Sequence, residues 1–210
     1  ATLAGAKFQV INRSANSVKV GDKIYAPGDV ICELTTDAKG TAKTGNIFPI
    51  GSYEIKEVAA PTGYLLNTQW KQTFSVTAEK KDHSFSYTDG SGCPETVISG
   101  KIQLTKKIVN TIDNLSVPEV GAEFSVTNSK GIVVDTIVTG EDGIGTSKEL
   151  PYGTYTVKQI SGQAGTIFCD AWDVTVDEHG KVYKYEKENP LWTASVSLHK
   201  KEAGVETPLI

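Results

Sequence analysis

Residues 49–57 of the chain read PIGSYEIKE, and residues 151–159 read PYGTYTVKQ. The two stretches share the pattern Pro-x-Gly-x-Tyr-x-x-Lys and lie about a hundred residues apart. The match continues upstream, where Gly5–Val10 (GAKFQV) corresponds to Gly121–Val126 (GAEFSV). A repeat of this length has the size of a domain. The chain therefore contains two copies of one module.

The composition excludes several classes of function. The chain has 210 residues, a formal net charge of -4 and no methionine. Its mixed charge favours no nucleic-acid partner, and no apolar run is long enough for insertion in a membrane. We interpret the chain as a piece of a longer protein, so that missing targeting signals carry little weight.

The cysteines and histidines do not predict a metal site. Cys32, Cys93 and Cys169 are too few for a disulfide framework and match no zinc spacing. We expect isolated thiols, with a single disulfide as the alternative. The three histidines are dispersed, and no set of residues suited to catalysis stands out. We therefore expect no metal, no cofactor and no enzymatic turnover.

Apolar and polar residues alternate along much of the chain, which indicates β-strands. Phe74–Thr77 and Val174–Val176 are examples. Turns rich in Gly, Asp and Pro separate such stretches, and helix signals are scarce. The sequence thus predicts an all-β chain of antiparallel β-sandwiches. With Asp89–Pro94 as the linker, module one spans 1–92 and module two spans 95–192.

The C-terminal stretch 193–210 resembles the beginning of module two. Ala194–Lys201 (ASVSLHKK) matches Gly100–Lys107 (GKIQLTKK), so we expect the first strand of a third module. Module one has no equivalent strand before Gly5, and the tail is also a candidate to complete it. An open sheet edge and a spare strand on one chain favour strand exchange within or between chains.

A string of motifs runs through both modules. It comprises a first strand ending in Lys, then Gly-Ala-x-Phe-x-Val, Thr-Asp-x-x-Gly, Pro-x-Gly-x-Tyr-x-x-x-Glu and Ala60-Pro61-x-Gly63-Tyr64. This string resembles the Cna B-type, prealbumin-like repeat domain of Gram-positive surface adhesins and sortase-assembled pilins. The resemblance implies two tandem Greek-key β-sandwiches of prealbumin or Ig-like type, plus a strand of a further module. It also implies a structural stalk or shaft segment, extracellular and attached to the cell wall, whose partners are other modules of the same surface protein.

The resemblance further implies an isopeptide bond that each module makes by itself. A Lys of the first strand joins an Asn or Asp of the last strand, and a Glu of a middle strand promotes the reaction. In module two the donor matches Lys106, or less well Lys101, and the acceptor matches Asn189. Gln159 stands at the position of the acid and cannot relay a proton. We therefore expect slow bond formation or none, with a hydrogen-bonded Lys106–Asn189 pair or solvated lysines as alternatives.

In module one the resemblance assigns different parts of the site. Glu57 matches the acid and Asp89 matches the acceptor, while the module's own donor would lie before Ala1. Lys200 of the tail matches the donor of a following module. If the tail docks on module one, a bond between Lys200 and Asp89 is expected.

The chemistry of such a bond depends on burial. A buried Lys is driven towards its neutral, nucleophilic amine, and a buried Glu towards its protonated form. The protonated Glu polarises the acceptor carbonyl and passes its proton to the leaving group. Because the fold holds the reactants in contact, the reaction proceeds once per molecule.

An alternative function is adhesion. Module one carries an insertion, Asn12–Pro27, that module two lacks. This insertion is the place where we expect contact with a host matrix protein or a glycan, if the chain binds one.

Overall fold

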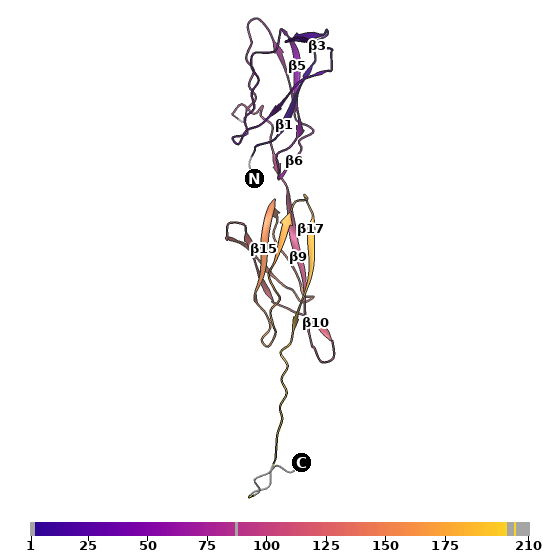
Figure 1. The fold of residues 1–210 in the computed structure, drawn as a ribbon, viewed down its shortest axis with the longest axis vertical. Helices are drawn as coiled ribbons and strands as arrows, with labels where there is room; N and C mark the ends of the chain where they lie inside the picture. Colours follow the sequence, from indigo (N-terminus) through magenta and orange to yellow (C-terminus); the bar gives the residue numbers. More distant parts are fainter. Residues whose placement is uncertain (1–2, 87, 201–203, 205–210) are drawn as a thin grey trace. The chain divides into compact units, whose positions relative to one another are not determined.

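The structure, a computed structural model, describes residues 3–86, 88–200 and 204. Every regular element of this described part is a β-strand, from β1 to β17, and the strands pair in antiparallel sheets (Figure 1). Consequently, the described chain has no helix that could cross a membrane. The prediction of an all-β fold is confirmed.

Module two is a sandwich of two sheets. The first sheet is built around the long strand β9 (Ser99–Val109), which pairs with β10 (Ser116–Pro118), β13 (Ile144–Thr146), β14 (Leu150–Pro151) and β17 (Val182–Pro190). The second sheet has the order β12 (Val133–Val138), β11 (Glu123–Asn128), β15 (Gly153–Ser161) and β16 (Trp172–Val176). Both sheets supply fully buried apolar side chains, among them Ile102, Leu104, Phe124, Val157 and Val176.

The repeat is visible in module one as a sheet with the same strand order. This sheet has the order β4 (Val30–Thr35), β1 (Lys7–Asn12), β5 (Gly51–Ala59) and β7 (Lys71–Val76). The described residues of module one contain no counterpart of β9. In module two, β17 pairs with β9, whereas residues 81–86, which the repeat matches to the start of β17, form no strand. We attribute this difference to the missing partner.

The insertion of module one forms a hairpin of β2 (Val18–Val20) and β3 (Lys23–Tyr25). Val18 is buried in the core cluster of module one, and Tyr25 packs against that cluster. The side-chain amide of Asn12 donates a hydrogen bond to the carbonyl oxygen of Tyr25, 3.0 Å away. The hairpin is therefore anchored on the sheet, and its role in ligand binding stays a prediction.

The end of the linker and the C-terminal tail are the two segments that bear on the predicted domain limits. β6 (Tyr64–Leu65) pairs with β8 (Thr96–Val97), so the end of the linker runs beside module one. Residues 193–200 of the tail belong to no strand, and 201–203 and 205–210 lie outside the described residues. The tail's assignment as an opening strand stays a prediction, as do the limits 1–92 and 95–192.

Candidate functional site

Lysine 106 lies in the core of module two because of its place in β9. Successive side chains of a strand point to opposite faces, and the inward row of β9 contains Ile102, Leu104, Lys106 and Ile108. The Lys106 side chain is 0% exposed, whereas Lys101 is exposed. Of the two lysines considered as donors, Lys106 is the one that the fold buries.

A carboxylate that the sequence motifs did not single out meets this lysine. Glu119 follows β10 directly, and its side chain is 0% exposed. Its Oε2 atom lies 3.1 Å from the Nζ atom of Lys106. The backbone holds Glu119 in place, since its N–H donates to the carbonyl of Lys106 and its own carbonyl accepts from the Thr139 hydroxyl.

Asparagine 189 completes the group from the end of β17, and it is also 0% exposed. Its Nδ2 atom donates a hydrogen bond to Glu119 Oε2 at 3.1 Å. The amine of Lys106 and the amide nitrogen of Asn189 therefore share one carboxylate oxygen. The other oxygen, Glu119 Oε1, accepts a hydrogen bond from the N–H of Gln163 at 2.7 Å.

The carbonyl of Asn189 is polarised from the opposite side. Its Oδ1 atom accepts a hydrogen bond from the backbone N–H of Cys169 at 3.0 Å. A backbone N–H in this position stabilises negative charge that develops on the carbonyl oxygen during attack. The side-chain amide of Asn189 thus has a carboxylate on its nitrogen and a hydrogen-bond donor on its oxygen.

Burial also changes the protonation equilibrium of the Lys106 side chain. Loss of solvent around Lys106 lowers the pKa of its ammonium below the ordinary value, although the hydrogen bond and negative charge of Glu119 act in the opposite direction. A lowered pKa favours the neutral amine, which is the form that attacks a carbonyl. Lys106 Nζ also donates a hydrogen bond to the carbonyl oxygen of Lys107 at 3.0 Å, which fixes its position.

Gln159 lies in the same pocket but does not take the role of the acid. It is 3% exposed, and its Nε2 donates to the carbonyl of Ser161 at 3.2 Å. Its Oε1 accepts from the N–H of Cys169 at 3.4 Å and from the Cys169 thiol at 3.5 Å. Gln159 thereby orients the segment that contacts Asn189. Glu119 brings a buried carboxylate to this group from another element, and the expectation of slow bond formation or none stays a prediction.

A comparison of the two repeats in the sequence could have pointed to Glu119. The residue stands two positions before the repeated Gly121–Ala122, where module one has Leu3. The structural equivalence is close, because Thr36 donates to the carbonyl of Leu3 as Thr139 does to that of Glu119. An acid in one repeat replaced by leucine in the other marks a position where the modules differ in chemistry.

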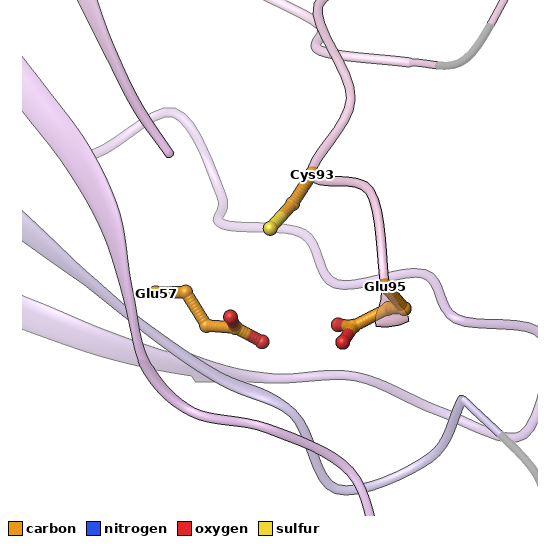
Figure 2. Close-up of side chains that lie close together, drawn as sticks. All are labelled: Glu57, Cys93 and Glu95. Carbon is orange, nitrogen blue, oxygen red and sulfur yellow. The ribbon is translucent and has the colours of Figure 1, made fainter. Parts of the chain in front are cut away.

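In module one, Glu57 has a different environment, which Figure 2 shows together with Cys93 and Glu95. Glu57 extends from β5 and is 5% exposed. Its Oε2 accepts a hydrogen bond from the N–H of Asn67 at 2.7 Å, and its Oε1 is buried with no hydrogen-bond partner in the described structure. One side-chain atom each of Glu57, Cys93 and Glu95 lie within 4.8 Å of one another.

The charges of this group are unfavourable. Burial first, and then the nearby carboxylate of Glu57, raise the pKa of Glu95 to about 7. Burial and the charges of Glu57 and Glu95 also raise the pKa of the Cys93 thiol to about 12, so this thiol is neutral at ordinary pH. Two carboxyls face each other here with no cation between them among the described residues. The sequence did not predict this arrangement.

The remaining residues predicted for module one lie apart from Glu57. Asp89 is exposed, and its carboxylate accepts hydrogen bonds from the N–H and the hydroxyl of Ser91. These bonds, the hydroxyl bond foremost, lower the pKa of Asp89. Lys200 is exposed in the tail. Within the described chain, no hydrogen bond or ion pair joins Asp89 or Lys200 to Glu57, so the predicted Lys200–Asp89 bond stays a prediction.

The three cysteines, all of them described, form no disulfide.

Strand order and core together define a class: a tandem of prealbumin-like domains, the second with a buried lysine, glutamate and asparagine in contact. The family model of the SpaA prealbumin-like fold domain matches residues 1–91 and 100–190. The chain belongs to this family.

Solved structures show the same fold. The Bacillus anthracis TIE protein is 24% identical with a TM-score of 0.62, and the match covers 90% of this chain and 31% of that one. The C-terminal fragment of the pilus adhesin SpaC from Lactobacillus rhamnosus GG is 14% identical with a TM-score of 0.50, and the match covers 93% of each chain. The chain thus spans about a third of the TIE protein. Comparison with the curated proteins gave no match.

Proposed function

We propose that the chain is a structural segment of the stalk or shaft of a Gram-positive surface protein or pilin, and that module two is stapled by an isopeptide bond between Lys106 and Asn189. The observation that carries the proposal is that one oxygen of Glu119, Oε2, lies 3.1 Å from Lys106 Nζ and 3.1 Å from Asn189 Nδ2. These are the nitrogen that would form the new amide and the nitrogen that would leave. Membership of the SpaA prealbumin-like family and the fold shared with a pilus adhesin support the role in a surface structure.

The reaction follows from the positions of the three side chains. Glu119 Oε2 takes a proton from the Lys106 ammonium, and the neutral amine attacks Cγ of Asn189. The N–H of Cys169 stabilises the negative charge on Oδ1. Glu119 then delivers the proton to Nδ2, and the bond between Cγ and Nδ2 breaks. Nζ loses a second proton as the amide forms, and Glu119 passes this proton to the departing ammonia, which leaves as ammonium. One amide forms for each amide broken, and Glu119 ends in its starting state.

This reaction is a single event in each molecule and not an enzymatic turnover. The two nitrogens are held on one carboxylate, so the fold supplies the proximity that a reaction between separate molecules lacks. Since the product remains in the core, no substrate enters or leaves. Gln159 acts as a positioning residue through Cys169.

The bond would give the module mechanical strength. It joins the first long strand, β9, to the last, β17, which pair in the same sheet. A pulling force that enters at β9 and leaves after β17 then passes through the covalent link and leaves the chain between them unloaded. We expect the partners of such a segment to be the neighbouring modules of the same surface protein, outside the cell.

Single-molecule stretching of the full chain, held at its two ends, tests the stalk function. The residues between Lys106 and Asn189 should add no length when the chain is pulled, whereas in Lys106→Ala they should extend. Extension of this segment in the unchanged chain would contradict the proposal. The control Lys101→Ala, which alters an exposed lysine of the same strand, should behave as the unchanged chain.

A further inference from the structure

The amide nitrogen of Asn189 contacts a second side chain besides Glu119. Its Nδ2 atom donates one hydrogen bond to Glu119 Oε2 at 3.1 Å and another to the hydroxyl oxygen of Thr166 at 3.5 Å. These two acceptors match the two hydrogens of a primary amide. Thr166 therefore contacts the nitrogen that would leave in the exchange between Lys106 and Asn189.

The hydroxyl of Thr166 presents its lone pairs to Asn189. Its single hydrogen is donated to the carbonyl oxygen of Gln163, 2.8 Å away. A hydroxyl whose hydrogen is engaged in this way can only accept from a further partner. It therefore favours the N–H side of the Asn189 amide over the carbonyl side. Together with the N–H of Cys169, which donates to Oδ1 at 3.0 Å, it holds the amide with Nδ2 directed towards Glu119.

The backbone fixes Thr166 beside the end of β17. Thr166 forms an isolated antiparallel bridge with Leu191, two residues after the acceptor. Thr166 is half-buried and Gln163 is exposed, whereas Asn189 is 0% exposed. The hydrogen bonds of the Thr166 hydroxyl thus lead from the buried amide nitrogen towards the solvent.

The two repeats differ at this position. Residues 60–64 (APTGY) correspond to residues 162–166 (GQAGT), so Thr166 stands where module one has Tyr64. The backbone supports this correspondence, because the glycine before each of these residues has a positive φ, 90° in module one and 80° in module two. Module two therefore differs from module one both in the position of its acid and in the residue beside the acceptor nitrogen.

We propose that Thr166 positions the leaving nitrogen of Asn189 and receives it as ammonium on its way to the solvent. This inference deepens the proposed function and rests on it. Glu119 supplies the proton to Nδ2 and the bond between Cγ and Nδ2 breaks, while Thr166 itself forms no covalent bond and gives up no proton. An ammonium ion in a dry core needs hydrogen-bond acceptors, and the hydroxyl oxygen of Thr166 offers one on the side of the solvent.

The rate at which the full chain loses ammonia tests this role. The chain is made by cell-free synthesis, and its intact mass is followed from the end of a short pulse. Thr166→Val keeps the shape of the side chain but removes the hydroxyl, and it should slow the loss about tenfold. Thr166→Ser returns the hydroxyl and should react nearly as fast as the unchanged chain. The matched control, Thr175→Val, removes an exposed hydroxyl of β16 and should leave the rate unchanged.

A second variant and the pH dependence separate this role from a purely structural one. Thr166→Ala removes the hydroxyl without adding a methyl group in its place, and each rate is divided by the folded fraction measured by circular dichroism. Thr166 has no titrating group, so both variants should be slower by the same factor at acidic, neutral and alkaline pH. If Thr166 only held the loop, Glu119 would lose the N–H of Gln163 in these variants, and the pH dependence would shift.

The outcomes distinguish this inference from the function on which it rests. Loss of ammonia at the unchanged rate in both Thr166→Val and Thr166→Ala overturns the role of Thr166 and leaves the isopeptide bond standing. A shifted pH dependence, or a Thr166→Ser variant as slow as Thr166→Val, overturns it as well. An unchanged chain that never loses ammonia contradicts the isopeptide bond itself, and with it the role of Thr166.

Discussion

At the scale of single residues, the two modules place their acids on different elements. Module one has Glu57 on β5, and module two has Glu119 after β10. Both are buried, but Glu119 has a cationic and an amide partner on one oxygen, whereas one oxygen of Glu57 has none in the described chain. Burial of a carboxylate is tolerated when partners replace water, and among the described residues this condition holds for Glu119 but not for Oε1 of Glu57.

Replacing the acid of module two should stop bond formation. In Glu119→Gln the amine of Lys106 has no group that can take and return its proton, and loss of such catalysis slows reactions by about 10²–10⁴-fold. Intact-mass measurement of the freshly purified chain should then show the full mass, without loss of one ammonia. Glu123→Gln is the control, and the intact mass of this variant should be lower by one ammonia. Normal loss of ammonia in Glu119→Gln would exclude Glu119 as the acid.

The stability of module one should depend on pH through Glu95. The fold raises the pKa of Glu95 from 4.5 to about 7, so the folded state binds more protons than the unfolded chain between these values. Stability is therefore highest below this window and falls as the pH rises through it. Thermal unfolding should show a lower melting temperature at pH 8 than at pH 5. Glu95→Gln should flatten this dependence, and an unchanged slope in that variant would contradict the assignment.

At the scale of elements, the segment after β15 keeps the site of module two closed. Gly162 lies against Glu119 and Gln159, and a Cβ atom at this position would come within 2.5 Å of Glu119 Oε1 and 2.6 Å of Gln159 Nε2. The absence of a side chain here lets the segment approach the carboxylate closely enough for the N–H of Gln163 to bind it. The loop thus helps to position the acid.

Gly162→Ala should therefore impair the site without touching any reacting group. We expect a loss of stability of about 1–3 kcal/mol, typical of overpacking, and slower loss of ammonia because Glu119 is displaced. Chemical denaturation and a time course of intact mass measure the two effects. Gly165→Ala is the control for loop strain, since Gly165 has a positive φ of 80° but no neighbour within 4 Å of an added Cβ. If that control slows the loss of ammonia as much as Gly162→Ala does, crowding of Glu119 is not the cause.

The elements also show what sequence patterns predict and where they fail. Period-2 alternation and the repeat indicated β5 and β15 correctly, because one face of each strand packs on the core. The motifs also led to Lys106 and Asn189, which the structure places around one carboxylate. They did not lead to Glu119, since its side chain becomes part of the site through a contact between segments distant in sequence. Residues 81–86 have the pattern of a strand but form none, because a strand also needs a partner.

At the scale of the whole molecule, the bond would act on the unfolded chain as much as on the folded one. It closes a loop of about 80 residues, which the chain-entropy model equates with about 4–5 kcal/mol of stabilisation. Asn189→Ala should lower the unfolding free energy of module two by about this amount, in addition to the cost of the lost side chain. Denaturant titration measures the change. An unfolding free energy equal to that of the unchanged chain would show that no such loop is closed.

The most direct measurement of the central claim is peptide mapping of the full chain by mass spectrometry. The account predicts one branched peptide in which the Lys106 and Asn189 segments are joined, with a mass lower than their sum by one ammonia. Full recovery of separate, unmodified peptides containing Lys106 and Asn189 would contradict it.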